Sequence, residues 1–99
     1  MAINKMRPIH PGEILREEYI LPLGISVNAL AGELRVPATR LHEIVNERRA
    51  ITADTALHLA QYFGGDAQSW LNLQSAYELK VTELERGKDI KKQVSPRAA

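Results

Sequence analysis

The sequence has no cysteine among its 99 residues, so neither a disulfide framework nor a thiolate metal site can form. No apolar run approaches the roughly 20 residues that span a bilayer. The opening stretch MAINKMRPIHPGE also lacks the apolar segment of a signal peptide. These absences argue against a membrane role, and we expect a cytoplasmic protein.

A large net charge is also missing, since 13 basic and 12 acidic residues leave a formal charge of only +1. This balance argues against an indiscriminate binder of polyanions. The charges are nevertheless unevenly distributed along the chain. Three glutamates lie near the start, and four arginines gather in the middle, at Arg35, Arg40, Arg48 and Arg49. A chain with little net charge can still carry one basic face.

The length fits a single domain, and a hydrophobic content of 44% is ordinary for a soluble fold. A domain of this size buries roughly 60 to 65% of the surface that its unfolded chain exposes, which leaves its stability marginal. Dimerisation adds stability to such a chain. We therefore expect a dimer.

The period-2 alternation of a β-strand is absent, whereas helix caps and helical spacing recur, so we predict an all-α fold. The first helix begins at Pro11 and runs to about Tyr19 or Ile20, where ILPLGI ends it. Ser26 caps a second helix that ends near Arg35.

Pro37 opens a third helix, in which Leu41, Ile44 and Val45 form an apolar stripe at helical spacing. Thr52 caps a fourth helix, which Gly64 stops.

Asp66 caps a long fifth helix with apolar residues on two faces, so we expect two packing partners. One is the core of the domain, and the other is a second copy of this helix. The predicted dimer interface consists of Trp70, Leu73, Tyr77 and Val81. For Trp70, an anchor in the core remains an alternative. We assign residues 1–86 to one domain and residues 87–99 to a basic, disordered tail.

The middle of the chain has the layout of a helix-turn-helix: NALAGEL, the turn RVP, and ATRLHEI. Two helices that meet at roughly 90 to 120° need a small residue where they touch, and Ala31 supplies it. Leu41, ten positions later, is the matching core residue. Many helical hairpins share this spacing, so the layout alone is only a moderate signal.

Three longer stretches carry a more specific resemblance: HPGEILREEYILPLGIS, VPATRLHEIVNERRAITADTALHLAQYFG and SWLNLQSAYELK. Together they resemble the HigA family of antitoxins, within the Xre and lambda-repressor-like helix-turn-helix group, over about residues 7–81. The resemblance implies a five-helix lambda-repressor-like domain and a homodimer that binds operator DNA. It also implies repression of the protein's own operon and neutralisation of a HigB-type ribonuclease toxin.

One position departs from the usual helix-turn-helix pattern, because Arg35 stands where glycine is common. If Arg35 adopts a positive φ, the side chain costs on the order of 1 kcal/mol.

The outward face of the third helix is the candidate base-reading surface, because its side-chain types can address base edges in the major groove. Its members are Ala38, Thr39, Arg40, His42 and Glu43. The alternative is a solvated face in which Arg40 pairs with Glu43, and Glu43 can equally repel phosphates. Candidate contacts to the DNA backbone are Ser26, Asn28, Asn46, Arg48, Arg49 and Thr52. A simple cap at Ser26 and a solvated basic loop remain alternatives.

The residue types do not favour catalysis, a metal or another cofactor. His10, His42 and His58 have neither HExxH spacing nor a cysteine nearby, and the serines lack a nucleophile-elbow setting. The acidic residues Glu13, Glu17 and Glu18 offer a docking face for a basic toxin. The rival interpretations are a stand-alone Xre-type regulator without a toxin and a helical adaptor that binds only protein.

Overall fold

The computed structural model describes residues 7–98, and all regular structure in that range is helical. The segments are α1 (Pro11–Ile14), η2 (Leu15–Ile20), α2 (Leu21–Leu23), α3 (Val27–Leu34), α4 (Ala38–Val45), α5 (Ala53–Phe63) and α6 (Ala67–Gln93). Because α1, η2 and α2 follow one another without a break, they form one rod. The predicted all-α architecture of five helices with a long last helix is confirmed.

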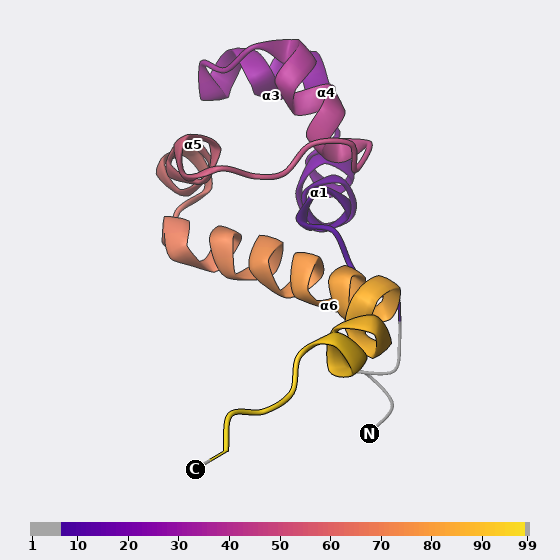
Figure 1. Ribbon diagram of the computed structural model, residues 1–99. Helices are drawn as coiled ribbons and strands as arrows, with labels where there is room; N and C mark the ends of the chain where they lie inside the picture. The colour runs from indigo at the N-terminus through magenta and orange to yellow at the C-terminus, as the bar shows by residue number, and fades with distance from the viewer. Residues whose placement is uncertain (1–6, 99) are drawn as a thin grey trace.

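The N-terminal rod lies between the two ends of the molecule (Figure 1). At one end α3 and α4 pack against each other, and at the other end lies α6. The segment α1 packs against both α4 and α6, while α5 packs against α3 and α6. The pair α3 and α4 is therefore held by the rod on one side and by α5 on the other.

The core is built from the apolar stripes that the sequence predicts. The stripe of α4 is fully inside, because Leu41, Ile44 and Val45 are all buried. Helix α3 contributes a second buried stripe and the rod a third. The remaining buried apolar residues are Leu15, Ile20, Leu30, Ala31, Leu34, Val36, Ile51, Ala56, Leu59 and Trp70.

The first helix is longer than predicted, because Leu21 keeps helical geometry (φ −62°, ψ −48°) and the rod ends only at Gly24. The reason lies in the π-helical segment η2, where the Leu21 N–H donates to the Arg16 carbonyl, five residues back. A proline in a regular α-helix collides with the carbonyl four residues before it. The wider π turn lets the helix pass Pro22. Gly24 then ends it at φ 67°.

Two of the three predicted caps make the expected hydrogen bond. Ser26 Oγ accepts from the Ala29 N–H at 3.0 Å, and Asp66 Oδ1 accepts from the Ser69 N–H at 2.7 Å. Thr52 occupies the N-cap position of α5 without a capping hydrogen bond from its side chain. The hydroxyl of Thr52 is therefore not committed to the helix that it precedes.

The segment expected to be disordered from residue 87 is helical as far as Gln93. Extending an existing helix costs much less than nucleating one, and Lys91 and Lys92 in the last turn favour the negative end of the helix. Residues 94–98 follow without regular structure. Within residues 7–98, no helix has the length and apolar character that crossing a membrane requires.

Candidate nucleic-acid interface

The turn between α3 and α4 contains a left-handed residue at the predicted position. Arg35 has φ 61° and ψ 41°, so the side chain carries the strain that glycine would avoid. The Val36 N–H donates to the Ala31 carbonyl at 3.1 Å, which closes the turn over the end of α3. Ala31 itself is buried, which agrees with its predicted place at the helix crossing.

A second left-handed residue, which the sequence analysis missed, ends α4. Glu47 has φ 63°, and its N–H donates to the Ile44 carbonyl at 2.9 Å. The Arg48 N–H then donates to the Glu43 carbonyl at 2.8 Å. The chain thus turns sharply after α4 and presents the following arginines close to the helix that precedes them.

The five candidate base-reading residues lie on α4 beside its buried stripe. Thr39 and His42 are exposed, while Arg40 and Glu43 are partly exposed. Ala38 is partly buried against the core, so it offers less surface than the others. The open face is therefore mainly polar, and its long side chains are those of Arg40, His42 and Glu43.

Arg40 does not pair with Glu43, as the alternative interpretation of the sequence held. Its Nη1 lies 2.7 Å from Asp54 Oδ2 and 3.5 Å from Thr55 Oγ1, both on α5. Glu43 Oε1 lies 3.0 Å from Arg49 Nε. Arg40 and Glu43 therefore each have a partner outside α4. The pairing could not be predicted from the sequence, because the packing of α4 against the following segment sets the partners.

These two ion pairs flank a depression of about 290 Å³ lined by Arg40, Arg49, Ala50, Thr52 and Thr55. The depression brings together a residue predicted to read bases, Arg40, and two predicted to contact the backbone, Arg49 and Thr52. Guanidinium groups and hydroxyls donate hydrogen bonds to phosphate oxygens. The lining therefore suits an anionic backbone.

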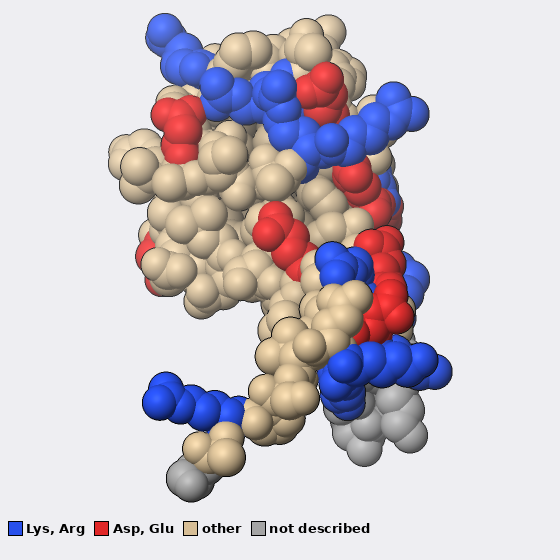
Figure 2. Space-filling model, in the orientation of Figure 1, with Lys and Arg blue, Asp and Glu red and all other residues tan. Residues whose placement is uncertain are grey.

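The remaining backbone candidates are placed around the same two helices. Asn28 on α3 lies beside α4, with its Oδ1 2.7 Å from His42 Nε2. Asn46 and Arg48 are exposed after α4, and Ser26 is exposed at the start of α3, where its hydroxyl caps the helix. Figure 2 shows basic side chains gathered over this end of the molecule, with carboxylates between them.

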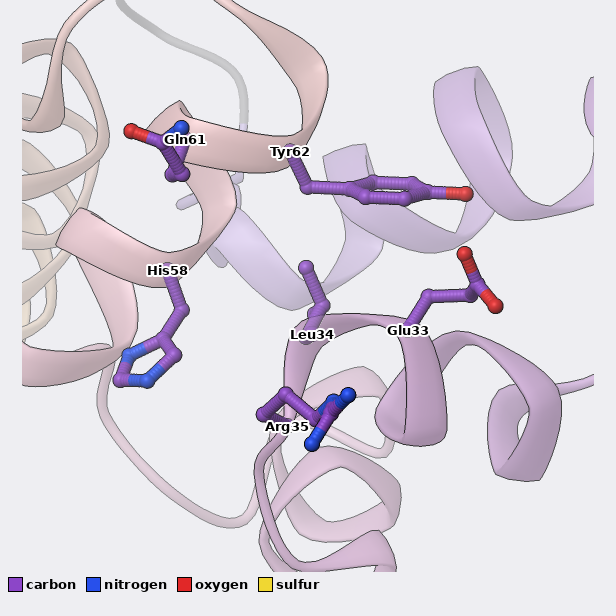
Figure 3. A pocket seen from close by; sticks show the side chains of 6 residues that line it. All are labelled: Glu33, Leu34, Arg35, His58, Gln61 and Tyr62. Atoms are coloured by element: carbon purple, nitrogen blue, oxygen red, sulfur yellow. The ribbon is translucent and has the colours of Figure 1, made fainter.

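A second depression, of about 420 Å³, lies between the end of α3 and α5. Figure 3 shows the residues that line it: Glu33, Leu34 and Arg35 at the end of α3, and His58, Gln61 and Tyr62 on α5. His58 also contacts the first turn of its own helix, because its Nδ1 lies 2.7 Å from the Asp54 carbonyl oxygen. The depression therefore lies next to Asp54, the residue that pairs with Arg40.

The acidic residues proposed for toxin docking are only partly available as free charges. Arg7 forms a double hydrogen bond with Glu13 at 2.8 and 2.7 Å, which lowers the pKa of that carboxyl. Glu17 and Glu18 are both exposed, and Glu17 Oε2 lies 3.1 Å from Arg16 Nε. Glu17 and Glu18 are therefore more accessible than Glu13.

Arg16 is a positioning residue that the sequence analysis missed. Its Nη1 donates to the Val45 carbonyl at the end of α4, and its Nη2 lies 3.5 Å from Glu47. It thereby joins the N-terminal rod to the turn that follows α4.

The predicted dimer surface needs one correction. Trp70 is only 6% exposed in a single chain, and its ring lies 5.4 Å from that of Tyr19, so it belongs to the core. Leu73, Tyr77 and Val81 are partly exposed. Further along α6, Leu79 and Leu84 are 62% and 68% exposed. An apolar surface is therefore present on α6, outside the position of Trp70.

The described histidines do not assemble into a metal site, since residues 7–98 contain no group of three His, Asp or Glu side chains placed to hold an ion. His10 is buried, with Nδ1 accepting from the Gly12 N–H at 2.8 Å, so it caps the first helix. His42 contacts Asn28, and His58 contacts Asp54.

A short helix, a tight left-handed turn and a second helix with one polar face define the helix-turn-helix class of DNA-binding folds. No family model matches the sequence. Virulence-associated protein I of Dichelobacter nodosus is 63% identical over 83 residues, which cover 84% of this chain and 77% of that protein.

Two solved structures share the whole fold. An addiction module antidote protein of the HigA family from Coxiella burnetii matches with a TM-score of 0.88 and 51% identity, covering 93% of this chain and 100% of that one. Antitoxin HigA of Pseudomonas aeruginosa, solved with the higBA promoter, matches with a TM-score of 0.89 and 47% identity over 93% and 100% of the two chains. The chain belongs to the HigA family of antitoxins.

Proposed function

We propose that this protein is the antitoxin of a type II toxin–antitoxin system. It binds operator DNA as a homodimer, represses its own operon and neutralises a HigB-type ribonuclease toxin. The observation that carries the proposal is the polar face of α4, which stands beside a depression lined by Arg40, Arg49 and Thr52. The HigA relative that carries promoter DNA supports it.

In this function α4 enters the major groove, because a helix fits that groove and its side chains can reach base edges there. Arg40 forms a bidentate hydrogen bond with a guanine, Thr39 contacts a thymine methyl group, and Glu43 accepts from a cytosine amino group. His42 and Ala38 complete the reading surface. Arg48, Arg49, Asn46, Thr52, Asn28 and Ser26 contact sugar and phosphate, and these contacts set the register.

Two copies of α4 in a dimer reach successive major grooves, about 34 to 36 Å apart. The operator is therefore a pseudo-palindrome whose half-sites lie about one helical turn apart. Leu73, Tyr77 and Val81 on α6 form the dimer contact, and the toxin docks against the acidic side of the rod, at Glu13, Glu17 and Glu18. The protein has no enzymatic activity of its own and acts in the cytoplasm, where its operator lies.

The test is a titration of the full chain against the duplex upstream of its own gene and against a scrambled duplex, at several salt concentrations. The expected result is tight binding to the first duplex and weak binding to the second, with an affinity that falls as salt rises. Arg97→Ala, in the segment after α6, is the charge-matched control and leaves the preference unchanged.

Two outcomes separate the rival functions. A protein that binds neither duplex is an adaptor rather than a regulator. A protein that binds its operator but does not relieve the growth arrest caused by the product of the adjacent toxin gene, or has no such gene beside it, is a stand-alone Xre-type regulator.

A further inference from the structure

We infer that Asp54 positions the Arg40 side chain for base reading and thereby raises the sequence specificity of the interface. Asp54 lies on α5, outside the helix that enters the groove, and no contact with a base is assigned to it. The inference rests on the proposed function, because it concerns how that same surface tells one duplex from another.

The geometry ties Arg40 to α5 through one nitrogen. Nη1 lies 2.7 Å from Asp54 Oδ2 and 3.5 Å from the hydroxyl of Thr55. Thr55 is 1% exposed, so its hydroxyl is a fixed point in the core. The guanidinium group has five N–H donors, and three of them, on Nε and Nη2, are outside these two contacts. A bidentate bond to guanine needs two donors.

His58, one turn later on α5, lies beside Asp54. A carbonyl oxygen can only accept a hydrogen bond, so the 2.7 Å contact between His58 Nδ1 and the Asp54 carbonyl places a proton on Nδ1. The same nitrogen lies 3.6 Å from Asp54 Oδ2. The line from His58 through Asp54 to Arg40 therefore connects the depression of Figure 3 with the polar face of α4.

The carboxylate has two effects on DNA binding. It holds a long, flexible side chain in one orientation before the duplex arrives, so less conformational freedom is lost on binding. It also repels phosphates, which weakens binding to every duplex by a common factor. Only the first effect enlarges the ratio between cognate and non-cognate affinity, and only the first depends on Arg40.

The experiment compares the wild-type protein, Asp54→Ala, Arg40→Ala and the double variant. Each is titrated against the cognate operator and against operators with one base pair substituted at each position of a half-site. The expected result is that Asp54→Ala lowers discrimination roughly three- to tenfold at the base pair that Arg40→Ala relaxes, and leaves it unchanged elsewhere. In the double variant, discrimination is no lower than in Arg40→Ala alone.

Glu33→Gln is the matched control, because it removes one exposed carboxylate from α3. It shifts affinity for all duplexes by a common factor. If Asp54→Ala behaves in the same way, Asp54 is only a surface charge and the inference is wrong. It is equally wrong if Arg40→Ala relaxes no position.

Two further measurements keep these results interpretable. Thermal unfolding of each variant checks the fold. Asp54→Asn is a second variant, which keeps the side-chain volume and loses the charge. It is expected to lose the same discrimination at the same base pair. Failure of the wild-type protein to bind its operator overturns the proposed function. Normal operator binding with unchanged discrimination in both Asp54 variants overturns only the positioning role.

Discussion

Gly12 on α1 and Ile44 on α4 approach so closely that a Cβ built on Gly12 would lie 1.8 Å from the Ile44 carbonyl oxygen. No side chain fits at that distance, so the two backbones are in direct contact. The placement of α4, the helix proposed to enter the groove, therefore depends on the absence of a side chain at residue 12.

Replacement of Gly12 by alanine is expected to destabilise the fold by about 1 to 3 kcal/mol, because the rod and α4 must separate. Urea denaturation measures the change. The matched control is Gly32→Ala on α3, where an added Cβ meets nothing within 4 Å. Alanine should stabilise that helix by about 0.5 to 1 kcal/mol. Equal effects at both positions would contradict the close approach.

The left-handed turn at Arg35 predicts a dependence on side-chain branching. Arg35→Val should lower the free energy of unfolding by about 1 to 2 kcal/mol, because a β-branched residue is strongly disfavoured at positive φ. Arg35→Gly should not destabilise the fold, since glycine adopts that conformation freely. Thermal unfolding of the two variants measures this difference. If Arg35→Val is as stable as the wild-type protein, the backbone at Arg35 is not strained.

The arginines of the interface should fall into two groups. Arg40→Ala is expected to cost about 1 to 3 kcal/mol on the cognate operator and to relax preference at one base pair, because it removes a bidentate contact. Arg48→Ala or Arg49→Ala should weaken binding to all duplexes and lower the salt slope by about one phosphate contact. Titrations at several salt concentrations separate them. Equal weakening of cognate and scrambled duplexes by Arg40→Ala would remove Arg40 from base reading.

The buried His10 predicts a loss of stability in mild acid. Burial lowers the pKa of His10 below the ordinary histidine value of 6.5, while Glu47 among others raises it in part. The unfolded chain therefore binds the proton more tightly than the folded protein does. The stabilisation is complete above pH 6.5 and declines as the pH falls through that value.

Measuring the free energy of unfolding at about pH 7.5 and about pH 5.5 tests this dependence. His10→Asn should flatten it, because asparagine also caps helices and does not titrate there. A variant with the same pH dependence as the wild-type protein would show that another group is responsible.

The apolar surface of α6 predicts a dimer. Leu73→Ala should weaken self-association and the fold together, because a fully buried leucine contributes about 1.5 to 3 kcal/mol. Leu57→Ala is the control, since Leu57 is 63% exposed on α5 and lies outside the predicted contact. Sedimentation velocity reports the oligomer, and a wild-type protein that stays monomeric at high micromolar concentration would rule the dimer out.

Several features could be predicted from the sequence because they depend on residues within about one helical turn of each other. The stripe of Leu41, Ile44 and Val45 follows from helical periodicity, and the caps at Ser26 and Asp66 bond to N–H groups three residues on. The place of Arg35 in the turn likewise follows from the local spacing of the two helices.

Other features depended on which helices meet, and no local pattern contains that information. The alternative interpretation of the sequence paired Arg40 with Glu43, three residues away, but the partner of Arg40 is Asp54, fourteen residues away, because the packing of α5 brings that carboxylate within reach. Tertiary packing likewise decided the place of Trp70, which is buried in the core, because the sequence left a core position and a dimer contact open for it. The sequence alone thus determined the order of the helices, the caps at Ser26 and Asp66, and the polar face of α4. Tertiary packing decided the partners of the long side chains, because their reach exceeds one helical turn and several partners compete for each of them.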